Sequence, residues 1–312
     1  MTPPLKKEGQ MQHHQPSSTA ETIAMHRAAE AMRPEDQRIC YDPLAIHFIS
    51  PQLLGRFKNP IRRAIARWVL NFFFPGVNGA IVARVRFMDD YLKACIEKGL
   101  EQLVIIGAGY DTRAYRFDLP DNRLRVFEVD RSATQKAKIG KLKSFLPDIP
   151  GHVSFVSMDI EKKNLEDKLP AAGYDPDKKT LFIMEGLVMY LTKAVVGELL
   201  TFIDSYSGKG SSVVFDYLPE SMVDGSVRAR EGRSMYRFVV KQGEPFRFGM
   251  APEQMGQFLS DKGFVHISNR PATDFKDAYF KGINQNRNIS ELFSFVHASL
   301  PNRQKRQMRL IL

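Results

Sequence analysis

Residues 103–113, Leu-Val-Ile-Ile-Gly-Ala-Gly-Tyr-Asp-Thr-Arg, constrain the fold more than any other stretch of the chain. The four aliphatic residues predict a buried β-strand, and Gly107, Ala108 and Gly109 follow it directly. Glycines at the carboxyl end of a strand let the backbone approach a ligand closely, and open α/β sheets bind nucleotides at that edge. The stretch therefore predicts an α/β fold with a ligand site at this loop.

A second apolar strand, residues 125–129, ends at Asp130. This acid stands 23 residues after Gly107, where a carboxylate can accept hydrogen bonds from both hydroxyls of a ribose. The two strands together predict a cofactor that contains adenosine.

The third glycine of the dinucleotide fingerprint Gly-x-Gly-x-x-Gly is missing, because Thr112 stands in its place. Asp111 would also repel a pyrophosphate lying on the loop amides. S-adenosylmethionine carries an ammonium, a sulfonium and no phosphate, so an acid is compatible with it. The charge pattern favours S-adenosylmethionine over NAD.

Three blocks resemble the leucine carboxyl methyltransferase superfamily in order and spacing: Gly-Ala-Gly-Tyr-Asp-Thr-Arg-Ala-Tyr-Arg at 107–116, Val-Phe-Glu-Val-Asp at 126–130 and Glu-Gly-Leu-Val-Met-Tyr-Leu at 185–191. Within it, the bacterial branch of S-adenosylmethionine-dependent O-methyltransferases is the most similar, and residues 41–45 and 245–249 extend the resemblance. The resemblance implies a Rossmann-like class I methyltransferase fold. It also carries cofactor binding onto Arg84, Gly107, Asp130, Asp159, Ile160 and Glu185.

Other strand ends suggest how the cofactor is held. Asp159 follows the third strand and suits the adenine amine, with Ile160 bracketing the ring. Glu185 follows the fourth strand and suits the ammonium of the methionine moiety. Arg84 would meet the cofactor carboxylate, although its alternative is a surface ion pair with an acid of its own helix.

Two further candidates keep two interpretations each. Asp111 either meets the ammonium or orients the glycine loop, or it caps the helix that begins there. Tyr190 is the candidate catalytic residue, since it could hydrogen-bond the methyl acceptor, but it could equally pack in the core. No set of residues at metal-ligand spacing is found, so no metal is expected.

Alternating apolar runs and longer intervening stretches predict a doubly wound, mainly parallel sheet, seven-stranded if the resemblance holds. The expected strands are residues 103–106, 125–129, 153–157, 180–184 and 212–217, with a late antiparallel strand near 264–268 at one edge. One domain, 19–300, would comprise N-terminal helices over 19–98, the sheet, and a helical insertion over 219–245 that caps the site.

The net charge of +10 is concentrated outside the expected core, in residues 56–98 and in a basic tail over 301–312. A nucleic-acid partner is therefore not expected.

Residues 1–18 are polar and predicted to be disordered, and the two cysteines are expected to be reduced thiols of a cytoplasmic protein. The apolar stretch 64–83 is too interrupted to span a membrane; it predicts a helix pair that forms a lipophilic substrate wall, a core element or a homodimer interface.

The expected activity is methyl transfer from S-adenosylmethionine to an oxygen of a small molecule with apolar or aromatic character. A carboxylate acceptor is already ionised at neutral pH, whereas a hydroxyl needs a base, and none of the three blocks contains a histidine. A protein C-terminal carboxyl methyltransferase, an NAD-binding protein and a non-catalytic binding protein remain as alternatives.

Overall fold

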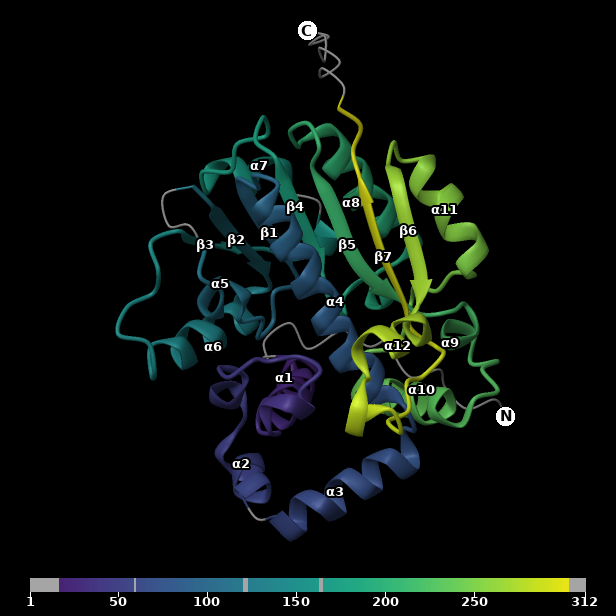
Figure 1. The fold of residues 1–312 in the computed structure, drawn as a ribbon. Coiled ribbons are helices and arrows are strands. Elements are labelled where there is room, and N and C mark those ends of the chain that lie inside the picture. Colours follow the sequence, from purple (N-terminus) through teal and green to yellow (C-terminus); the bar gives the residue numbers. More distant parts are fainter. Residues whose placement is uncertain (1–16, 59, 120–122, 163–164, 303–312) are drawn as a thin grey trace, which may run out of the picture.

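The chain folds around a central sheet with helices on both faces (Figure 1). The computed structural model describes residues 17–302 except 59, 120–122 and 163–164. The strands are β1 (Gln102–Ile106), β2 (Arg125–Asp130), β3 (Val153–Ser157), β4 (Thr180–Met184), β5 (Ser212–Tyr217), β6 (Val265–Pro271) and β7 (Ser294–Ser299). The seven-stranded, mainly parallel sheet that we predicted is confirmed.

The strand order is β3-β2-β1-β4-β5-β7-β6, and β1 to β5 pair in parallel. After β1 the chain adds β2 and β3 on one side of the sheet, and it then crosses back to add β4 and β5 on the other side of β1. Open α/β sheets bind ligands at such a switch point. One prediction was wrong: the late strand, β6, is not antiparallel to its sheet. Residues 294–299 form β7, which pairs antiparallel with both β5 and β6 and so leaves β6 parallel to the rest.

Alternate residues of the strands point into two separate cores, as the period of a strand requires. Leu103 and Ile105 of β1 pack with one cluster, which includes the long helix α4 (Val77–Glu97), whereas Val104 and Ile106 pack with the other, which includes α8 (Lys193–Ser205) and α11 (Pro252–Ser260). Apolar residues on both faces are typical of a parallel sheet covered by helices on each side. The sheet edge at the carboxyl ends of β1–β4 is therefore held rigidly from both faces.

Four helices precede the sheet and eight follow its first strand within the described residues. They are α1 (Ser18–Ala31), α2 (Pro51–Lys58), α3 (Pro60–Phe73), α4 (Val77–Glu97), α5 (Arg113–Arg116), α6 (Ser132–Leu142), α7 (Leu165–Ala171), α8 (Lys193–Ser205), α9 (Ser221–Asp224), α10 (Arg230–Gln242), α11 (Pro252–Ser260) and α12 (Lys276–Tyr279). The segment predicted as a helical insertion, 219–245, contains α9 and α10.

The boundary that we predicted for the N-terminal tail, 1–18, differs at its end. The Ser17 side chain accepts a hydrogen bond from the Ala20 amide at 3.2 Å, and α1 begins at Ser18. A serine at this position satisfies an amide that has no partner inside the helix. Residues 1–16, and residues 303–312 of the predicted basic tail, lie outside the described part of the chain.

The helix pair predicted over 64–83 divides into two helices with opposite surroundings. The first turns of α4 are buried in the core, whereas α3 lies at the periphery and exposes large apolar side chains. Within the described residues, we find no helix that combines the length and the apolar character needed to cross a membrane.

Candidate active site

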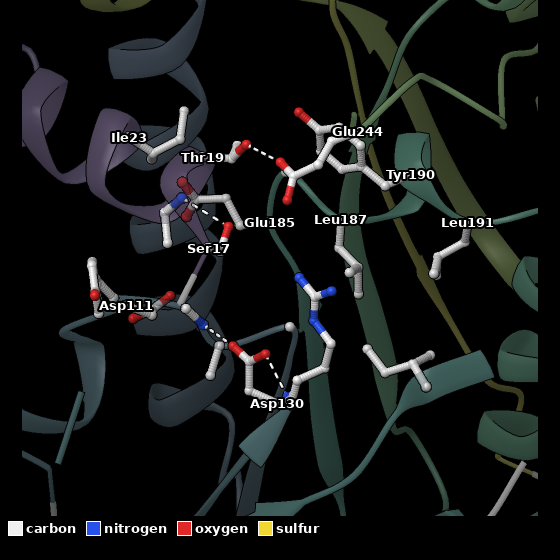
Figure 2. Close-up of a pocket in the computed structure, with 18 of the residues that line it drawn as sticks. Ser17, Thr19, Ile23, Asp111, Asp130, Glu185, Leu187, Tyr190, Leu191 and Glu244 are labelled. Carbon is white, nitrogen blue, oxygen red and sulfur yellow. Dashed lines mark hydrogen bonds between the residues drawn. The ribbon is translucent and has the colours of Figure 1, made fainter. Parts of the chain in front are cut away.

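A cavity of about 770 Å³ opens at the carboxyl edge of the parallel strands (Figure 2). Its volume lies within the range of about 300–1,000 Å³ that is usual for ligand pockets. All ten of the predicted site residues line it: Arg84, Gly107, Ala108, Gly109, Asp111, Asp130, Asp159, Ile160, Glu185 and Tyr190. The sheet thus brings together residues that are spread over more than a hundred positions of the sequence.

The loop after β1 presents bare backbone to this cavity. Gly107 and Gly109 have φ angles of 68° and 44°, in the left-handed region that favours glycine. The amides of Gly107 and Ala108 donate to the Val129 carbonyl at 2.8 and 3.1 Å, which fixes the loop against the end of β2. A Cβ added to Gly107 would lie 2.8 Å from Leu187 Cδ1, so the loop has no room for a side chain there.

Asp130 sits where β2 ends and anchors the same loop. Its Oδ2 accepts from the Gly109 amide at 2.5 Å and its Oδ1 from the Arg131 amide at 2.6 Å. Burial raises the pKa of Asp130, and the two amides partly offset that increase. A carboxylate has about four acceptor positions, so two remain for further donors such as a ribose diol.

Behind the glycine loop lies a network of buried charges. Arg84, on α4, donates to Glu185 Oε1 at 3.2 Å and to Asp216 Oδ2 at 2.7 Å. Arg113, at the start of α5, pairs with Glu185 Oε2 at 2.7 Å and with Asp89 Oδ1 at 2.8 Å, and it also contacts Asp111. Both arginine side chains are at most 2% exposed. Such charges are tolerated inside a protein only when they are paired in this way.

The network lowers the pKa of two of its acids, Glu185 and Asp111, whereas burial raises the pKa of Asp216. Burial alone would raise the pKa of Glu185, but Arg113 and Arg84 outweigh that effect and lower it. Burial alone would also raise the pKa of Asp111, but the charges of Arg113 and Arg27 outweigh it and lower the pKa to about 2. The cavity wall therefore presents fixed negative charge at the position where the sequence predicts a ligand ammonium.

The contacts show how Arg84 and Asp111 are held, while their roles toward the cofactor stay predictions. Arg84 faces the cavity, whereas Arg86 forms an exposed ion pair with Asp90, 2.8 Å away on the same helix. Arg84 Nε is buried and has no hydrogen-bond partner in the described part of the chain. Asp111 has the helix-start role as well, since its Oδ1 accepts from the Arg113 amide at 2.7 Å.

Asp159 and Ile160 lie beyond the end of β3 and form another part of the cavity wall. The Asp159 carboxylate turns back on its own backbone, where Oδ1 accepts from the Glu161 amide at 3.3 Å. An acid and an aliphatic side chain side by side could contact the polar edge and the flat face of an aromatic base.

A polar group that the sequence did not reveal lies on the side of the cavity away from Asp130 (Figure 2). Thr19 Oγ1, on α1, donates to Glu244 Oε2 at 2.5 Å, and Tyr190 lies next to this pair. Burial raises the pKa of Tyr190, so its phenol stays protonated and can act as a donor. Leu187 and Leu191 supply apolar wall nearby.

Glu244 and Thr19 escaped the sequence analysis because they come from segments 225 residues apart and belong to no motif. Glu244 follows α10, so the last residues of the predicted insertion do reach the cavity. Arg113 and Asp216 were missed as well. Arg113 stands inside a quoted block, but only the fold shows that it and Asp216 carry the charge network.

Comparison with known proteins identifies the family from the sequence. The leucine carboxyl methyltransferase family model matches residues 20–204. YktD of Bacillus subtilis, named "Putative S-adenosyl-L-methionine-dependent methyltransferase", is 30% identical over 253 residues, which cover 81% of this chain and 82% of that protein. A Mycobacterium avium protein with the same description is 27% identical over 274 residues, covering 84% of this chain and 88% of its own.

Two crystal structures share the fold at low sequence identity. A protein from Thermobifida fusca that is described as a putative methyltransferase superposes with a TM-score of 0.56 at 14% identity. The match covers 78% of this chain and 89% of that protein. A DUF574 family protein from Streptomyces avermitilis gives the same TM-score and identity and covers 89% of this chain and 97% of its own. The chain therefore belongs to the leucine carboxyl methyltransferase family and is an S-adenosylmethionine-dependent methyltransferase.

Proposed function

We propose that the protein transfers the methyl group of S-adenosylmethionine to a hydroxyl oxygen of a small molecule. The observation that carries this proposal is the carboxylate of Glu244 on the acceptor side of the cavity, held by Thr19 and flanked by Tyr190. Bound S-adenosylmethionine supplies an electrophilic methyl group on a sulfonium. Everything else in the reaction falls to the residues of this chain.

The cofactor-side residues divide the ligand among them in this proposal. Asp130 accepts from the ribose hydroxyls, and Asp159 with Ile160 receives the adenine. Glu185 and Asp111 face the ammonium, and Arg84 is the donor for the carboxylate. The backbone of Gly107, Ala108 and Gly109 lies along the methionine moiety. Supporting this division is the way their positions line one cavity, with acids and Arg84 in the pattern a zwitterion requires.

The acceptor side favours a hydroxyl over a carboxylate. A carboxylate acceptor beside Glu244 would meet a second negative charge; of the four described arginines that line the cavity, Arg84 is assigned to the cofactor, Arg27 pairs with Asp42 and Arg247 pairs with Glu161. A hydroxyl, in contrast, needs a group that takes its proton as the oxygen attacks, and the Glu244 carboxylate provides one. Tyr190 donates a hydrogen bond that orients the same oxygen. Alignment and exclusion of water supply the rest of the acceleration.

The test is transfer of labelled methyl from S-adenosylmethionine to a panel of phenols, alkanols and carboxylic acids, and to a peptide with a free C-terminal leucine. We expect turnover with hydroxyl compounds. Glu244→Gln should lower that turnover by about 10²–10⁴-fold, the usual contribution of a general base, and leave S-adenosylhomocysteine affinity unchanged. Glu253→Gln, an exposed glutamate on α11, is the matched control. Methylation of acids or of the peptide alone, or an unimpaired Glu244→Gln enzyme, would overturn the proposal.

A further inference from the structure

Helix α3 exposes the stripe that an ordinary surface helix buries. Apolar residues recur at the spacing of one helix face, at Ile61, Ile65, Trp68 and Phe72. Ile65 is 57% exposed, Trp68 68% and Phe72 47%. The Trp68 and Phe72 rings stack on each other, with centroids 5.8 Å apart, and so form one continuous aromatic surface.

The neighbouring helix α10 extends this surface. Arg230 lies 4.0 Å from the centroid of the Phe72 ring, and the Phe74 ring packs edge-on against Phe238 at 6.3 Å. Phe238 is itself 43% exposed. We call Ile65, Trp68, Phe72 and Phe238 the docking face. In Figure 1 both helices lie below the sheet, with α10 near the C-terminal end of α3.

The segments that carry the docking face are strongly basic. Residues 51–73 contain five basic residues and no acidic one, and α10 contains four basic residues and one acid. The α10 cations Arg230, Arg233, Arg237 and Lys241 are all exposed. An amphipathic helix with Trp and Phe on one face and cations beside them is typical of segments that lie in the plane of a lipid interface.

We propose that the docking face binds the surface of a membrane that contains anionic lipid, with α3 lying along the interface. A second copy of the chain fits less well, because an isologous dimer would place these basic segments against themselves. An anionic surface instead complements the charge and takes up the apolar stripe. This proposal does not depend on the methyl acceptor. It does place α10, which leads into Glu244, at the membrane side of the cavity.

The experiment uses the full chain and its own probe, since Trp68 is the single tryptophan of the sequence. The protein is titrated with vesicles of pure phosphatidylcholine, and with vesicles in which about a quarter of the lipid is phosphatidylglycerol. We expect Trp68 emission to shift to shorter wavelength, and co-sedimentation to be about tenfold tighter, with the anionic vesicles. No binding to anionic vesicles, or equal binding to both kinds, would overturn the proposal.

Variants separate lipid binding from other occupants. The double variant Ile65→Ser/Phe72→Ser keeps the probe and should abolish the spectral shift, whereas Tyr41→Ser, which alters an aromatic side chain that is 51% exposed on neither helix, should retain it. A double variant that still binds anionic vesicles would contradict the proposal. The proposal would also be contradicted if the emission shift grew with protein concentration in the absence of lipid and analytical ultracentrifugation gave a doubled mass. That result would assign the docking face to a second copy of the chain.

Discussion

Charged side chains are buried at the sheet edge, whereas large apolar side chains are exposed on helix α3. At the sheet edge, Arg84, Arg113 and Glu185 are buried with their charges paired, whereas Trp68 and Phe72 of α3 face outward. Both arrangements run against the usual distribution of residues, in which charges are exposed and large apolar groups are buried. On the two proposals above, each departure marks a place where a ligand binds: the cofactor at the sheet edge and a lipid surface at α3.

The largest effect should come from breaking the buried network. Arg84→Ala leaves Glu185 and Asp216 without their shared cation, and removing one partner of a buried ion pair costs about 3–5 kcal/mol. Arg86→Ala, two residues along the same helix, removes a pair with 46% and 36% exposed side chains and should cost less than about 1 kcal/mol. Urea denaturation measures both. Equal losses would show that burial of the network does not govern stability.

The pH dependence of stability should sharpen the same contrast. The pKa of Asp111 is about 2 in the folded protein, below the value of about 4 in an unfolded chain. A lowered acid pKa stabilises the fold above the unfolded value, and that stabilisation disappears as the pH falls toward the folded value. The stability gap between the wild type and Asp111→Asn should thus shrink between about pH 4 and pH 2, by about 2 kcal/mol. A gap that widens on acidification would contradict the assignment.

The glycine loop offers a smaller and more selective test. Gly107→Ala forces a side chain into a backbone with φ of 68° and against Leu187, which should cost roughly 1–2 kcal/mol and weaken S-adenosylhomocysteine binding. Gly99→Ala is the matched control, because its φ is 77° and nothing lies within 4 Å of the added Cβ. Calorimetry should show weakened binding only for Gly107→Ala. Weakened binding in both variants would mean that backbone strain, not the cavity, is responsible.

The smallest effect belongs to α3. Trp68→Ser should change the free energy of unfolding by less than about 0.5 kcal/mol, because the side chain makes little buried contact. Thermal denaturation of the isolated protein measures it. A loss of several degrees in melting temperature would show that the aromatic stripe packs against the body of the protein, and the contrast between the two regions would disappear.

Sequence patterns located the first five strands because each is a short run rich in apolar residues between longer intervening stretches. Most of the cavity-lining positions followed from the ends of those strands, since the carboxyl ends of parallel strands converge on one edge, whereas Arg84 came from the family resemblance and Tyr190 from a motif block; the roles that we assign to them stay predictions. β7 was not foreseen, because Ser294–Ser299 is a six-residue strand with a histidine and two serines and has little apolar alternation.

What the sequence could not supply is tertiary proximity and orientation. Periodicity shows that α3 has one apolar face, but it does not show whether that face points to the core or to solvent. Nothing local connects Thr19 with Glu244, or Arg84 with Asp216, because these contacts exist only after the chain has closed around the sheet. Asp111 and Asp130, in contrast, were found because one follows the glycines of the first loop and the other ends the second apolar strand, and both positions can be read along the sequence.

The most direct test is calorimetric titration of the purified protein with S-adenosylhomocysteine and, separately, with NAD, repeated on Asp130→Ala. We predict binding of S-adenosylhomocysteine, no binding of NAD, and a loss of about tenfold or more in the variant, because a charge-assisted contact contributes about 1.5–3 kcal/mol. Binding of NAD, or an affinity for S-adenosylhomocysteine that Asp130→Ala leaves unchanged, would contradict the assignment of this cavity as the cofactor site.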